Sequence, residues 1–120
     1  MSEKHLHEVV DEIKYLIDQG KANDALPLTH LLLSHYPRYI QGYQLLAEIA
    51  LEEGYTIDAI EVLQRILSAD PENFVAHAGL AVAFKNKEQA EDALWHIQRA
   101  FEMEPRLPQV REEVRQISKL

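Results

Sequence analysis

Three prolines, Pro37, Pro71 and Pro105, are spaced 34 residues apart in this chain of 120 residues. Without a gap, the same spacing aligns Ala25, Ala59 and Ala93; Leu26, Ile60 and Leu94; and Leu33, Leu67 and Phe101. A fixed period of this length is the signature of a repeat architecture, in which each unit stacks on its neighbours. The predicted units span residues 6–39, 40–73 and 74–107, and a terminal segment spans 108–120.

Each unit is predicted to form two helices. In the second unit, apolar residues recur at helical spacing over residues 40–52, and Gly54 follows as a residue that tolerates positive φ at a helix end. A second helical pattern covers residues 57–68 and ends before Pro71, which cannot continue a helix. The aligned alanines allow paired helices to approach closely.

These features resemble the tetratricopeptide repeat (TPR), a 34-residue helix-turn-helix unit with an early large residue, a Leu–small pair, Gly, Ala and a closing Pro. The resemblance covers residues 6–107 and departs from the pattern at Glu12 and Ile13, and at Glu88, which replaces the third turn glycine. It implies an all-α, right-handed superhelical solenoid of antiparallel helix pairs. With one terminal helix, we expect seven helices in a single domain over residues 1–120.

The terminal segment is predicted to be a capping helix. Val110, Val114 and Ile117 form one apolar stripe, which Leu120 can extend. Such a stripe suits a helix that lies on the third unit. The opposite face presents Arg111 where a further repeat would show a core residue, so this helix should close the array.

Stacked helix pairs leave a concave face lined mainly by the first helix of each pair. By resemblance, the expected groove residues are Val10, Asp11, Lys14, Gln41, Gln44, Leu45, Glu48, Leu51, Glu52, Val75, Ala78, Gly79, Val82 and Lys85. Much of this set is apolar, and Gly79 could admit a ligand backbone. Glu48 and Glu52, one helical turn apart, make one side acidic. We therefore expect a partner peptide with apolar anchors and basic residues.

One function of the family can be checked directly. Members that hold the C-terminal carboxylate of chaperones use a clamp of Lys, Asn and Arg in the groove. The equivalent positions here are Val10, Lys14, Leu45, Val75 and Gly79. A single cation remains, so we do not expect binding of this kind.

Composition argues against several other classes of protein. The net charge of −8 disfavours nucleic acid as a partner, and no apolar run approaches the ~20 residues of a membrane span. The chain has no cysteine, its six histidines lack the i, i+4 spacing of a zinc helix, and it has no phosphate loop. We expect a cytoplasmic protein that is not an enzyme and has no cofactor or metal. His77 should pack between helices, and Trp95 should cover the capping helix or mark a second contact surface.

An adaptor that binds a partner in its groove is one of two functions left open. The alternative is a self-associating structural or scaffold module, which could be the N-terminal part of a larger protein. The expected oligomeric state is a monomer or a weak homodimer.

Overall fold

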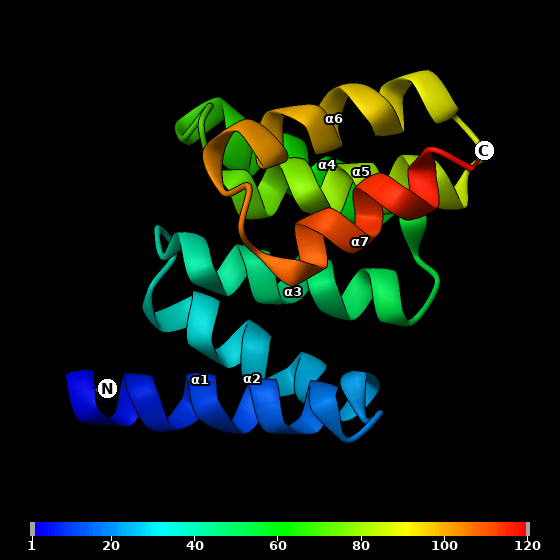
Figure 1. Ribbon diagram of the computed structural model, residues 1–120. Helices are drawn as coiled ribbons and strands as arrows, with labels where there is room; N and C mark the ends of the chain where they lie inside the picture. Colours follow the sequence, from blue (N-terminus) through cyan, green and yellow to red (C-terminus); the bar gives the residue numbers. More distant parts are fainter. Residues whose placement is uncertain (1, 120) are drawn as a thin grey trace.

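The computed structural model describes residues 2–119, which form three antiparallel helix pairs and one terminal helix (Figure 1). The helices are α1 (Glu3–Asp18), α2 (Ala22–His35), α3 (Ile40–Glu52), α4 (Thr56–Ala69), α5 (Phe74–Asn86), α6 (Ala90–Met103) and α7 (Pro108–Ile117). Over this part of the chain there are seven helices and no strand, as the repeat predicts. Leu120, the suggested extension of the α7 stripe, lies outside the described residues.

The turn inside each helix pair has one recurring geometry. Gly20 and Gly54 have φ of 74° and 81°, and Glu88 adopts the same left-handed conformation with φ of 59°. In the second turn, the N–H of Tyr55 donates to the carbonyl of Ala50 at 2.8 Å, and the other two turns contain the equivalent bond. This Schellman arrangement ends a helix by pairing a carbonyl that has no partner within the helix.

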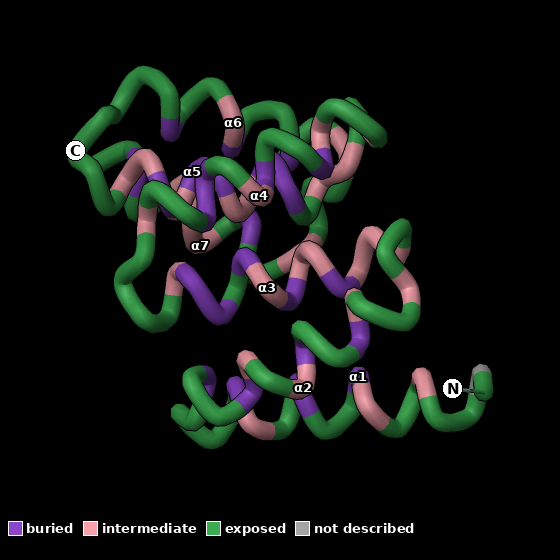
Figure 2. Tube along the Cα trace, turned by 180° about the vertical axis from the view of Figure 1, so that it is seen from behind, coloured by how far each residue is buried: buried purple, intermediate pink, exposed green. Residues whose placement is uncertain are grey.

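Small side chains bring the paired helices together. Ala25, Ala59 and Ala93 are each completely buried, so the helix backbones can approach closely at these positions. Larger apolar side chains fill the space between units and produce the buried segments that follow the inner faces of the helices (Figure 2). Full burial of one such side chain, as for Leu80, stabilises the fold by roughly 1.5–3 kcal/mol.

The terminal helix α7 packs on α5 and α6, which confirms the predicted capping position. Val110 and Ile117 are buried and join an apolar cluster with Ala93 and Ile97 of α6. The apolar stripe read from the sequence is therefore the buried face of this helix.

An aromatic cluster lies between α5 and α6. His77 is only 4% exposed, which confirms that it packs between helices. The ring of Trp95 lies 4.8 Å from that of His96 and 5.9 Å from that of His77, and the Arg99 guanidinium lies 5.3 Å from its centre. These contacts are all on α5 and α6, so the expectation that Trp95 covers the terminal helix is not supported.

Within residues 2–119, no helix combines the length and the apolar character that crossing a bilayer requires.

Candidate functional site

A hollow of about 700 Å³ lies between α3, α5 and α7, and we refer to it as the groove. In Figure 1, α7 lies in front of α5 and above α3. The lining comprises Lys14, Gln41, Gln44, Leu45, Ala47, Glu48, Leu51, Leu63, Phe74, Val75, Ala78, Gly79, Val82, Leu107, Pro108, Gln109, Val110, Glu112 and Glu113. The first helices of the second and third units thus form one side of the groove, and the terminal helix forms the other.

The floor of the groove is apolar. Leu45, Leu63 and Val110 line it although each is at most 3% exposed, because most of each side chain is packed into the core below. Val82 is half-buried, and Val75 at the side is 37% exposed. Covering these side chains with apolar groups of a partner would remove their remaining surface from water, which is favourable.

Gly79 has a packing role on this floor. A Cβ atom added to it would lie 3.0 Å from one methyl carbon of Leu63 and 3.1 Å from the other, closer than ordinary van der Waals contact. The absence of a side chain on α5 therefore gives Leu63 of α4 its space. Access for a ligand backbone at Gly79 stays a prediction.

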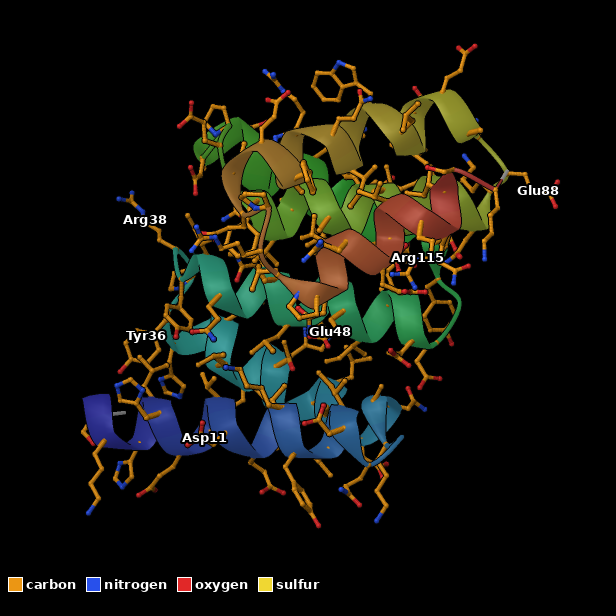
Figure 3. All side chains as sticks on the ribbon, in the orientation of Figure 1. Asp11, Tyr36, Arg38, Glu48, Glu88 and Arg115 are labelled. Carbon is orange, nitrogen blue, oxygen red and sulfur yellow. The ribbon has the colours of Figure 1, made fainter. Side chains whose placement is uncertain are left out.

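Glu48 places a carboxylate at the edge of the apolar floor. It lies on α3 between α1 and α7 (Figure 3). Partial burial raises the pKa of Glu48, the carboxylates of Glu52 and Asp18 raise it further, and the ammonium group of Lys14 acts in the opposite direction. A cation beside Glu48 would relieve this repulsion and favour the ionised carboxylate.

Three polar contacts hold the walls of the groove in place. The side-chain amide of Gln44 donates to Asn73 Oδ1 at 3.1 Å, and the same oxygen accepts the N–H of Ala76 at 2.9 Å as the N-cap of α5. Lys85 Nζ lies 2.9 Å from Glu113 Oε2 and links α5 to α7. Contacts within the chain therefore set the spacing between α3, α5 and α7.

Ten of the fourteen residues predicted for the groove line it, and Val10, Asp11, Glu52 and Lys85 do not. Val10 is 4% exposed and belongs to the core between the first and second units, because its face of α1 turns toward α3. Asp11 and Glu52 are exposed outside the lining, and Lys85 is engaged with Glu113. The position of Asp11 on α1 is shown in Figure 3.

The contribution of α7 to the groove was not predicted from the sequence. A signal for it exists, because the 34-residue spacing aligns Gln109 with Gln41 and Val75, and all three line the groove. The helix thus takes the place of the first helix in a fourth unit. The apolar stripe of α7 predicted which face of this helix is buried. It did not predict that another face of the same helix lines the groove.

No group of three or more His, Asp or Glu side chains within the described part of the chain is placed to hold a metal ion.

The arrangement of the helices is similar to that of solved TPR domains. The first TPR domain of human RPAP3 has a TM-score of 0.84 and 17% identity, over 95% of this chain and 90% of that one. The P58(IPK) TPR domain has a TM-score of 0.84 and 19% identity, over 97% of this chain and 33% of that one. The first TPR of Spaghetti (RPAP3), bound to the HSP90 peptide SRMEEVD, has a TM-score of 0.82 and 16% identity, over 99% and 94%.

No protein-family model matches the chain, and no curated protein sequence matches it. At identities below 20%, the structural matches establish the architecture rather than any activity. Together with the columns repeated every 34 residues, they show that this chain has the tetratricopeptide-repeat fold.

Proposed function

We propose that the protein is a protein-interaction module that holds a segment of a partner polypeptide in the groove. Apolar side chains of the partner would cover the floor at Leu45, Ala78 and Val82, and a Lys or Arg would lie beside Glu48. The observation that carries this proposal is the apolar floor bordered by Glu48, whose pKa is raised by burial and by neighbouring carboxylates. The floor supplies the driving force, and the carboxylate selects the charge of the partner.

The charge of the groove distinguishes it from a site for an acidic peptide. The peptide bound to the Spaghetti TPR, SRMEEVD, contains three acidic residues. Among the positions equivalent to the carboxylate clamp, Lys14 is the only cation. Glu112 and Glu113 also line the groove, but Glu112 pairs with Arg115 at 3.0 Å and Glu113 pairs with Lys85 at 2.9 Å. The carboxylate of Glu48, which lies among other carboxylates, makes a basic segment the better electrostatic match.

Titrating fluorescent peptides that carry two apolar residues and a Lys, alongside copies with Glu in place of Lys, tests the proposal. The Lys peptide should bind more tightly, and Glu48→Lys should weaken it about tenfold, equivalent to about 1.4 kcal/mol. Added salt should weaken binding further, because it screens the charges. Glu61→Lys is the matched control, since it makes the same charge change on an exposed residue of α4 outside the groove. Equal affinity for the two peptides, or equal losses in both variants, would refute the electrostatic selection.

One observation supports self-association as a second candidate function. Leu94 and Phe101 on α6 are 39% and 41% exposed, whereas Ile60, which aligns with Leu94 at the 34-residue spacing, is 9% exposed and packs against the following unit. A second copy could cover this face. Light scattering over a concentration series separates the two functions, because the peptide-binding proposal expects a monomer and a scaffold expects a mass that grows with concentration. A dimer that is lost in Phe101→Lys would favour the scaffold.

A further inference from the structure

A second hollow lies on the opposite side of α3 from the groove. It measures about 280 Å³ and lies between α2, α3 and α4. From α3 and the residue that caps its C-terminus it is lined by Leu46, Ile49, Ala50 and Glu53, none of which lines the groove. We refer to it as the side pocket. Its contents would be separated from any groove ligand by the full width of the α3 helix.

Comparison of the three units explains why the side pocket exists. Ala50 and Val62 line it, and in the third unit the residues at these two positions are Phe84 and His96. Those two rings stack there, with centres 5.6 Å apart and planes inclined by 12°. The structure therefore has an aromatic pair between the two helices of the third unit, where Phe84 also packs against the core shared with the second unit. At the equivalent positions of the second unit it has a hollow.

The first unit has a third pair of side chains at the positions equivalent to Ala50 and Val62. They are occupied by Leu16 and Leu28, and both pack against the core of that unit. The second unit thus has the smallest pair of side chains, an alanine and a valine. The hollow corresponds to the place that the ring of Phe84 takes one unit later. An aromatic ring should therefore fit the side pocket, because the third unit accommodates the ring of Phe84 at the equivalent position.

The rim of the side pocket is polar and carries negative charge. Glu53 and Asp58 line it and are exposed, while Leu26 from α2 adds to its apolar wall. The 34-residue spacing aligns Asp58 with Asp24 and Asp92, whereas it aligns Glu53 with Gln19 and Lys87, so only the second unit has two carboxylates at these positions. A basic group next to an inserted ring would lie close to both carboxylates, and complementary charge of this kind favours one partner over another.

We propose that the side pocket is a second binding site, which takes an aromatic side chain of a partner protein that has a Lys or Arg beside it in sequence. The ring would occupy the place of the missing Phe84 equivalent, against Ala50 and Val62, and the basic group would contact Glu53 and Asp58. This site goes beyond the proposed function of the groove and does not depend on it. A partner could occupy either site or cross the molecule to reach both.

The experiment uses the capped dipeptide acetyl-Phe-Lys-amide as a probe in an NMR titration of the full chain. The methyl signals of Ala50 and Val62 and the amide signal of Tyr55 should shift in a saturable manner, while those of Val82 in the groove stay constant. The probe acetyl-Ala-Lys-amide, which lacks the ring, should bind at least tenfold more weakly. The probe acetyl-Phe-Glu-amide, which reverses the charge, should bind about threefold more weakly. These ratios separate the contribution of the ring from that of the charge.

Two variants test the position of the site. Ala50→Phe should fill the side pocket as Phe84 fills its counterpart, weaken the probe at least tenfold and raise the melting temperature. If that variant does not fold, charge reversal at the rim by Glu53→Lys with Asp58→Lys leaves the core untouched and should reverse the preference between the Lys and Glu probes. Retained probe affinity in a folded Ala50→Phe variant, or an unchanged preference in the rim variant, would overturn the proposal.

Three further results would also overturn it. One is a probe that shifts only groove signals such as those of Val82. A second is a close contact in the free protein between the Tyr55 ring and the Ala50 methyl group, because the exposed tyrosine would then fill the side pocket itself. The third is a concentration-dependent shift at Ala50 that disappears in Trp95→Ala, which would identify a second copy of this chain as the occupant. Failure of the groove titration leaves these results unaffected, since the two sites report through different residues.

Discussion

Replacing Glu88 with glycine is expected to stabilise the protein. Glu88 has a φ of 59° in the turn between α5 and α6, at the position where the first two units have Gly20 and Gly54. A residue with a Cβ atom loses about 1–2 kcal/mol in this left-handed conformation. Glycine avoids that cost but makes the unfolded chain more flexible, which removes about 0.4–1 kcal/mol of the gain. The expected net increase in the free energy of unfolding for Glu88→Gly is about 1 kcal/mol.

Urea unfolding followed by circular dichroism measures this change, together with a rise in melting temperature of roughly 4 °C. Glu88→Ala is the matched control: it removes the carboxylate and keeps the Cβ atom, so its stability should stay close to that of the parent chain. Gly54→Ala provides the reverse test and should lose about 1 kcal/mol. A Cβ atom at Gly54 would meet no other atom within 4 Å, so this loss can come only from the backbone conformation.

Equal stabilisation of the chain by Glu88→Ala and Glu88→Gly would contradict an origin in the backbone conformation. The gain would then come from removing a negative charge from a chain of net charge −8 rather than from relieving backbone strain. The position of Glu88 at the exposed end of the α5–α6 turn is visible in Figure 3, where the side chain points away from the helices.

Two further predictions concern pH. Burial and nearby carboxylates raise the pKa of Glu48, so ionisation of this side chain opposes folding. The stability that the protonated side chain contributes is fully present below the ordinary glutamate pKa. It is lost as the pH rises through the raised pKa of the folded protein. Glu48→Gln should therefore raise the melting temperature at pH 7 and have little effect near pH 3, and an equal effect at both values would contradict this. For His96, burial and the neighbouring His77 lower the pKa from 6.5 to about 4, so the unfolded chain binds the proton more readily and stability should fall as the pH drops from 6.5 toward 4. His96→Phe keeps a ring against Phe84 and should flatten the melting temperature over this range, whereas an unchanged slope would rule out His96 as its source.

The sequence predicts best those features that depend on contacts or backbone conformations inside a single unit and that every unit needs. The turn glycines, the prolines between units and the buried alanines each act through a backbone conformation or a close helix contact. They therefore recur at the same spacing and can be recognised without knowing any long-range contact. The strength of this constraint is visible at Glu88, which takes the left-handed conformation although its side chain disfavours it.

The candidate sites were less predictable, because they depend on how one unit meets the next. Val10 was expected in the groove from its position in the repeat, but the packing of α1 on α3 buries it. The place of α7 along the groove depends on contacts such as that between Lys85 and Glu113, which no periodic pattern reports. The side pocket exists because Ala50 is small. That an aromatic ring would fit it is indicated only by the structure, in which the ring of Phe84 stacks on His96 at the equivalent positions.

Both hollows share α3, and the physical reason lies in the order of the units. The second unit has a repeat neighbour on each side, so its first helix is flanked by α1 and α2 on one side and by α4 and α5 on the other. Glu48 lines the groove and Ala50 lines the side pocket, and these two residues lie on opposite faces of the helix. Under the two proposals, α3 would have one ligand on each face without a change of fold, because each face is supported by a different neighbouring unit. If the two sites are coupled, the coupling must pass through α3, and occupancy of one by its probe should change the affinity measured at the other by the same factor in both directions.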